Sequence, residues 1–298
     1  MTEEEKIKGL DVKGGTRPLK AGDPVAYINE GIHYQGKIDA ILKNGDTVLK
    51  IYNIKDVDKL TVPKEAKIEP LFTITKDNKE VYLKYTYNEV KEALAKADDI
   101  KTNFSNREKP IFALMQGDKT AVVSFEKKIE DKMSNVEGRL EMRRKSETGV
   151  PYITGDVKFK ELNLDRPVYG MQLNESQKEQ LKNTGELGLV DGFTRKSGEQ
   201  FKLWVSLDKE LNKVVTKSAN DIYLGHIFGV QPSEKQVAEL KQGKGVVMDV
   251  KGQNYFFQVS AATQKLNGIK SFKEETAKEL GLIAKEENQK KNSKGVKM

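Results

Sequence analysis

The C-terminal half of the sequence contains an internal repeat, and this repeat constrains the fold more than any other feature. Residues 170–182 and 229–241 carry Gly, Gln, Glu, Gln, Leu and Lys at matching places, and the second copy starts fifty-nine residues after the first. A repeated segment of this length indicates one structural unit built twice. Because duplicated units rarely carry duplicated catalytic centres, the repeat favours a binding scaffold.

Each copy predicts a helix followed by three strands. Asn174 and Ser233 are good helix N-caps, and each is followed three residues later by Gln, which predicts a capping box in both copies. The strand pair of the first copy is five residues longer, and its extra turn carries Arg195 and Lys196. We therefore expect two tandem α-β-β-β repeats, over residues 169–224 and 225–283.

The N-terminal third has short runs of β-forming residues separated by turn-forming residues. Runs at 23–28, 34–42 and 47–52 are divided by Asn, Gly and Asp, and two shorter runs follow. This pattern predicts a small SH3-like or Tudor-like β-barrel over residues 1–71. Fold alone does not identify function.

Residues 72–168 predict a central α+β region that carries a basic hairpin. Thr86 is a suitable N-cap for a helix that extends to Ala97. We expect strands at 110–115 and 120–125, a short helix at 126–133, and a hairpin whose first strand spans 136–145. The whole chain is thus expected to be α+β.

Composition narrows the functional classes. The chain has no cysteine, which excludes disulfides, thiolate nucleophiles and cysteine-ligated metals. No apolar stretch reaches the roughly 18–20 residues of a membrane span. The first residues are acidic and lack an apolar core, so we expect no secretory signal, a cytoplasmic location and no membrane partner.

Nearly half of the net charge of +7 lies near the end of the chain. The last fifteen residues hold five lysines and two glutamates, and we expect 284–298 to form a disordered basic tail. The remainder is almost balanced, whereas DNA-binding domains are usually more basic. Mixed charge is also the ordinary way to solvate a protein surface.

The sequence contains no recognisable motif for catalysis or cofactor binding. The two histidines, His33 and His226, lie in separate regions, and neither has a partner four residues away. Packing or solvated roles suit both better than metal ligation. We expect no enzyme activity, no cofactor and no metal.

Several basic and aromatic residues could contact nucleic acid. Arginine forks suit phosphate, and tryptophan can stack on a base. The same features have plainer interpretations, because the hairpin arginines could be solvated, Trp204 could be core, and the aromatic run 255–257 could pack on a neighbouring unit or a partner. The candidate residues are Arg139, Arg143, Arg144, Lys145, Arg195, Lys196 and Trp204.

Three segments carry a family resemblance: 173–188, 201–208, and 136–144 ahead of Arg166-Pro167. Over roughly 136–272 the chain resembles uncharacterised proteins of Bacteroidetes mobile elements, in which a helix-plus-hairpin unit recurs. The second copy departs from that pattern, because Pro232 replaces Leu and its hairpin turn has only Lys251-Gly252. The resemblance implies a context of conjugative transposons, plasmids or phages, and no catalytic residues.

Two functional hypotheses follow. The first is a non-enzymatic accessory protein of a mobile genetic element that binds DNA or RNA weakly or within a nucleoprotein complex. The second is a protein–protein interaction module, or an inhibitor of a host factor, that uses the repeats and the barrel as docking surfaces. Balanced charge in the folded part and the aromatic strands favour the second.

Overall fold

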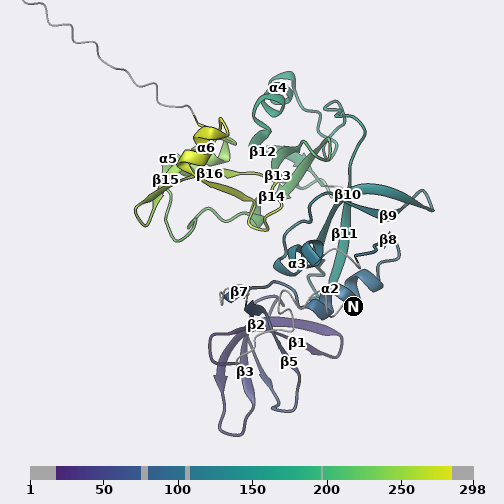
Figure 1. Cartoon of the computed structure of the whole chain (residues 1–298), viewed down its shortest axis with the longest axis vertical. Helices are drawn as coiled ribbons and strands as arrows, with labels where there is room; N and C mark the ends of the chain where they lie inside the picture. The colour runs from purple at the N-terminus through teal and green to yellow at the C-terminus, as the bar shows by residue number, and fades with distance from the viewer. Residues whose placement is uncertain (1–17, 75–79, 105–107, 196, 284–298) are drawn as a thin grey trace, which may run out of the picture. The chain divides into compact units, whose positions relative to one another are not determined.

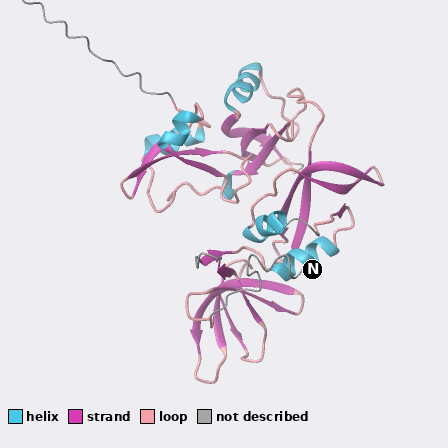
Figure 2. Cartoon of the chain, in the orientation of Figure 1, coloured by secondary structure: helices cyan, strands magenta, loops and turns pink. Residues whose placement is uncertain are grey.

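The computed structural model describes residues 18–74, 80–104, 108–195 and 197–283. The fold is mixed α and β, and strands predominate (Figure 2). The chain divides into two compact units, which are described separately. The first comprises the chain up to Asn163 with Lys209–Lys213 and Gln264–Leu266, and the second comprises Leu164–Asp208, Val214–Thr263 and the chain from Asn267. The expected tail at 284–298 lies outside the described residues.

The first unit begins with an antiparallel five-stranded sheet of order β4-β3-β2-β1-β5 (Figure 1). Its inward side chains, among them Val25, Ile38 and Leu49, form one apolar cluster. The turn before β3 contains Asn44-Gly45, and Gly45 has a φ of 93°, a value that glycine adopts easily. The strands are β1 Pro24–Asn29, β2 Ile32–Ile41, β3 Thr47–Ile51, β4 Lys59–Val62 and β5 Ile68–Pro70.

The rest of the first unit is a second sheet with two helices. Its strand order is β11-β10-β9-β8, and a separate pair joins β6 to β7. The elements in chain order are β6 Phe72–Ile74, β7 Glu80–Tyr82, α2 Tyr87–Ala95, β8 Ile100–Lys101, α3 Glu108–Gln116, β9 Val123–Ile129, β10 Lys132–Arg144 and β11 Pro151–Val157.

Helix α2 forms where the sequence predicts it. The Thr86 side chain accepts a hydrogen bond from the Glu89 backbone N–H, and the Glu89 carboxylate accepts one from the Thr86 N–H. This capping box satisfies two backbone donors at the start of the helix. Val90 and Ala93 then face the core.

The prediction of a strand at 110–115 was wrong, because this segment is helix α3. Pro110 lies in the first turn of the helix, where its missing N–H has no partner to lose. Leu114 and Met115 are fully buried and follow Ile111 at helical spacing. A short apolar run does not distinguish a buried strand from a buried helix.

The predicted helix at 126–133 is also wrong, because β9 and β10 form a hairpin through this segment. Glu130 and Asp131 at its turn have φ values of 48° and 65°, as a two-residue type I′ turn requires. Val123 and Phe125 are buried whereas Ser124 and Glu126 are exposed. This alternation has the period of a strand.

The second unit contains two three-stranded sheets, each preceded by a helix (Figure 1). The strand orders are β12-β13-β14 and β15-β16-β17, and both sheets are antiparallel meanders. The elements are α4 Glu175–Thr184, β12 Glu186–Thr194, β13 Gln200–Asp208, β14 Lys213–Ser218, the 3-10 turn η2 Ala219–Asp221, α5 Glu234–Lys241, β15 Val246–Val250, β16 Gln253–Val259, β17 Ile269–Lys273 and α6 Glu274–Glu279. Lys213, the first residue of β14, belongs to the first unit.

Both predicted capping boxes are present. The Asn174 and Ser233 side chains accept from the backbone N–H groups of Gln177 and Gln236, and each glutamine side chain accepts in return. Helix α4 ends at Gly185, whose φ of 79° is left-handed, the usual role of glycine after a helix. No helix in the described ranges is long and apolar enough to cross a membrane.

Candidate functional site

Two of the four predicted cations on the basic hairpin are buried within the first unit. Arg139 is 4% exposed; its Nη1 donates to the Thr120 carbonyl oxygen at 2.9 Å, and its Nη2 pairs with Glu210. The Arg144 side chain is 10% exposed. Both guanidinium groups therefore bond to the protein's own groups rather than facing solvent. Arg143 and Lys145 are exposed, although Arg143 lies 3.2 Å from Glu141.

Arg144 and Glu89 form a buried pair with two hydrogen bonds. The Nη1 and Nη2 atoms of Arg144 donate to the two Glu89 carboxylate oxygens at 2.8 and 2.9 Å, and Nη1 also donates to the Gly149 carbonyl. The guanidinium lies 4.6 Å from the centre of the Tyr85 ring. Such a paired, hydrogen-bonded and stacked arginine has a structural role.

His33, on β2, completes this cluster. Its Nδ1 lies 3.4 Å from a Glu89 carboxylate oxygen, so the first sheet meets helix α2 at this carboxylate. Burial raises the pKa of Glu89, but the hydrogen bonds from His33 and Arg144 outweigh burial and hold the pKa below its ordinary value. His226 is exposed. Across the described ranges, no group of three or more His, Asp or Glu side chains is placed to hold a metal.

Trp204 is a core residue of the second unit. It is 2% exposed and packs with Val246, Phe257 and Ile269 from the second sheet of that unit. Strand β13 thus contributes a side chain to the core beneath β15–β17. The indole is not available to stack on a base.

The two helix-and-sheet elements of the second unit also meet through two glycines. A Cβ at Gly188 would lie 2.2 Å from the Lys241 carbonyl oxygen, and a Cβ at Gly243 would lie 2.8 Å from the Gly188 nitrogen. Neither distance is compatible with a side chain. The backbones of β12 and of the turn after α5 are therefore in direct contact.

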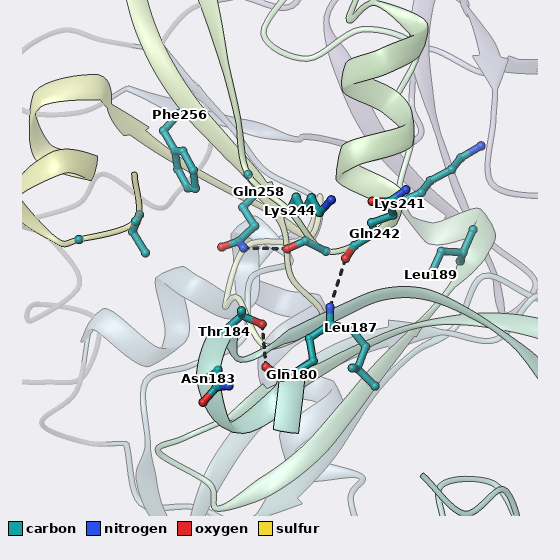
Figure 3. A pocket seen from close by; sticks show the side chains of 14 residues that line it. Gln180, Asn183, Thr184, Leu187, Leu189, Lys241, Gln242, Lys244, Phe256 and Gln258 are labelled. Atoms are coloured by element: carbon teal, nitrogen blue, oxygen red, sulfur yellow. Dashed lines mark hydrogen bonds between the residues drawn. The ribbon is translucent and has the colours of Figure 1, made fainter. Parts of the chain in front are cut away.

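A cavity of about 750 Å³ opens beside this contact (Figure 3). Gln180 donates to the Gln242 carbonyl at 3.3 Å, and Gln258 donates to the Gly243 carbonyl at 2.9 Å. Lys241 and Lys244 also line the cavity. The Gln180 bond crosses the junction between the two elements and helps to hold them together, whereas the Gln258 bond lies within the second element.

A buried carboxylate crosses the same junction. Glu186 is 1% exposed; one oxygen accepts from Lys270 Nζ at 2.8 Å, and the other accepts from the Ser206 hydroxyl. Ser206 in turn accepts from the Ala261 backbone N–H at 2.7 Å. Burial raises the pKa of Glu186 above its ordinary value, although Lys270 opposes the shift.

Two matching turns expose an aromatic ring in each half of the second unit. Val168 bridges Met171 and Ile227 bridges Val230, and the residues between them are Tyr169-Gly170 and Phe228-Gly229. The φ values are 47° and 80° in the first turn and 53° and 82° in the second. Tyr169 is 63% exposed and Phe228 is 60% exposed. An aromatic residue rarely adopts this left-handed conformation.

Tyr169 packs edge-on against a second aromatic ring, and a cation lies over that second ring. Its ring centre is 5.9 Å from that of Phe201, which is half-buried on β13. The Arg195 guanidinium lies 5.4 Å from the Phe201 centre and pairs with Glu199 at 3.1 Å, and the Arg195 side chain is 59% exposed. We call Tyr169, Phe201 and Arg195 the aromatic–arginine face. Lys196, predicted beside Arg195, lies outside the described residues.

The sequence predicts a contact role for Arg195, whereas Tyr169 and Phe228 were not predicted. The signal was available, because an aromatic residue precedes glycine at both 169–170 and 228–229, fifty-nine residues apart. The capping-box spacing from Thr86 to Glu89 also predicts that Glu89 folds back, but not that Arg144 meets it. That contact joins residues 55 positions apart.

Comparison with family models, curated proteins and solved structures finds no match to this chain.

Proposed function

We propose that the protein is a non-enzymatic accessory protein of a mobile genetic element and binds single-stranded nucleic acid through its second unit. The observation that carries the proposal is the aromatic–arginine face, where exposed Tyr169 adjoins Phe201 and the Arg195 guanidinium lies over the Phe201 ring. Aromatic rings stack on bases of any sequence, and an adjacent arginine supplies phosphate contact and cation–π attraction. The mobile-element context rests on the sequence resemblance.

The proposed architecture is a scaffold. We propose that residues 169–224 and 225–283 are copies of one unit, supported by the shared helix, meander and aromatic-glycine turn. We also propose that the first sheet is SH3-like and that the protein works in the cytoplasm. Two buried carboxylates, Glu89 and Glu186, are held in structural ion pairs, which supports a scaffold rather than a catalyst.

A fluorescence anisotropy titration of the full chain with a labelled twenty-nucleotide oligothymidylate tests this function. We expect binding at about 50 mM salt that weakens several-fold at 200 mM, because phosphate contacts release counterions. Arg195→Gln should weaken binding and flatten the salt dependence. Lys202→Gln is a matched control, since Lys202 is a similarly exposed cation paired with Asp191. No binding at 50 mM salt, or equal loss in both variants, would contradict the proposal.

Protein contact is a second candidate, favoured by apolar side chains on the first sheet and its loops. Ile28, Ile41, Leu42 and Tyr52 are 42–59% exposed. Exposed apolar groups of this kind mark interaction surfaces when they lie together. A pull-down from nuclease-treated host lysate should then recover a stoichiometric partner that the Ile41→Glu variant loses.

A further inference from the structure

We infer that Phe228 is a second nucleobase-stacking site, separate from the aromatic–arginine face and dependent on stacking alone. This inference rests on the proposed function and adds a second contact to it. Phe228 occupies the same place in its turn as Tyr169, fifty-nine residues earlier. The shared ligand chemistry is an unpaired base, from DNA or RNA.

The conformation of the turn does not explain why position 228 is aromatic, because this backbone conformation favours other residues. With φ values of 53° and 82°, Phe228-Gly229 has the conformation that Asn-Gly adopts most readily. A bulky aromatic residue is strained there, and such strain collects at binding sites. Both turns nevertheless carry an aromatic ring that is at least 60% exposed. A strained backbone that carries an exposed ring occurs at both Tyr169 and Phe228, and this recurrence indicates that the ring itself contacts a ligand.

The surroundings of Phe228 provide a stacking surface. Its ring centre lies 5.5 Å from that of Phe257, and Phe257 lies 6.2 Å from Tyr255 on the same strand. Phe257 is buried and Tyr255 is half-buried, so the exposed ring rests on a packed aromatic base. A ring fixed in this way loses little freedom when a base stacks on it.

Phe228 differs from the first site in charge. Arg195 lies over Phe201, whereas no cation lies over the rings of Phe228, Tyr255 or Phe257 in the part of the chain that the structure describes. The second site should therefore add affinity without adding to the salt dependence, since that dependence comes from phosphate contacts. This separation makes the two sites distinguishable.

The test is an anisotropy titration of the full chain with twenty-nucleotide oligothymidylate and, in parallel, oligouridylate. Phe228→Asn removes the ring and keeps a residue that tolerates the turn. We expect its affinity to fall about tenfold, in line with the loss of one stacked base, with an unchanged salt slope. Phe228→Tyr should retain binding, and Tyr223→Ala, which removes another exposed ring of the second unit, should have no effect.

The results distinguish failure of the Phe228 site from failure of the proposed nucleic-acid binding. If the wild type binds and Tyr169→Asn weakens binding but Phe228→Asn does not, the second site is overturned and the proposed function survives. If the wild type binds neither oligonucleotide, both fail. A loss in Phe228→Asn that Phe228→Tyr fails to restore, or that changes the salt slope, also overturns stacking at Phe228. A loss in Phe228→Asn with either oligonucleotide supports the second site, and oligodeoxyuridylate, which differs from oligouridylate only in the sugar, then identifies the preferred sugar.

Discussion

Two arginines of the basic hairpin were predicted to contact phosphate because of their charge, but their burial gives them a structural role. Arg139 and Arg144 have the side chains of a phosphate-binding hairpin, yet each is buried against an acidic partner and a backbone carbonyl. Arginine satisfies several acceptors at once, so it serves buried pairs as readily as phosphate. The sequence alone does not distinguish these uses, because Glu210 and Glu89 lie 71 and 55 positions from their arginines.

Removing one partner of the Glu89–Arg144 pair should be costly. Glu89→Gln leaves a guanidinium that is 10% exposed without its charge partner, and we expect a loss of about 3–5 kcal/mol in the free energy of unfolding. Urea denaturation followed by circular dichroism measures this loss. The double variant Glu89→Gln, Arg144→Met should recover most of the stability. A single variant within 1 kcal/mol of wild type would contradict a tight pair.

The two buried carboxylates should respond to pH with opposite signs. The pKa of Glu89 is lowered on folding, so its stabilisation is present above the ordinary value of 4.5 and is lost as the pH falls through the folded pKa. The pKa of Glu186 is raised, so its contribution is present below 4.5 and is lost as the pH rises through the folded pKa. Urea midpoints from pH 3 to pH 8 measure both.

Glutamine variants show which part of the pH dependence of stability comes from Glu89 and which from Glu186. Relative to wild type, Glu186→Gln should become more favourable as the pH rises, because it removes a buried charge. Glu89→Gln should compare worst with wild type at neutral pH and less badly in acid. Parallel curves for wild type and both variants would show that neither carboxylate titrates differently in the folded chain.

At the scale of elements, local patterns predicted the helices with caps and failed where short apolar runs lacked them. Thr86, Asn174 and Ser233 each cap a helix as expected. Segment 110–115 was predicted as a strand and is a helix, and segment 126–133 was predicted as a helix and is a strand hairpin. Pro110 gave a helix-start signal within the first segment, and the Glu130-Asp131 turn is unusual because neither residue is glycine.

The first aromatic-glycine turn predicts that binding can be lost without a loss of stability. Tyr169→Asn places Asn-Gly in a turn with two positive φ values, and the relief of strain offsets the lost ring contacts with Phe193 and Phe201, so we expect stability within about 1 kcal/mol of wild type. The same change should weaken oligonucleotide binding about tenfold through loss of a stacked base. Thermal denaturation and anisotropy on one preparation measure both. Tyr169→Phe is the control and should preserve binding.

At the scale of the molecule, the second unit is one compact body that contains two helix-and-sheet elements. Gly188 and Gly243 bring their backbones together, Trp204 enters the neighbouring core, and Glu186 bonds across the junction. The repeat predicted two similar elements, but contacts between them depend on residues that differ between the copies. Position 245 corresponds to Glu186 and is glycine, and position 258 corresponds to Trp204 and is glutamine.

This junction should be intolerant of even a methyl group. Gly188→Ala places a Cβ against backbone atoms at a φ of 79°, so it combines steric overlap with backbone strain. We expect a loss of at least about 2 kcal/mol in stability. Gly198→Ala has a similar φ of 85° but open space around the Cβ, so it isolates the steric effect. Equal losses in the two variants would mean that the close approach at Gly188 does not exist.

Photocrosslinking tests most directly the central claim that the second unit binds single-stranded nucleic acid through its exposed aromatic rings. The full chain is irradiated with an oligonucleotide carrying 5-iodouracil, and the attached peptides are mapped by mass spectrometry. The account predicts crosslinks at Tyr169 and Phe201, and at Phe228, with loss at Tyr169 in the Tyr169→Asn variant. Crosslinks confined to the first unit, or at the same sites and yields in that variant, would contradict it.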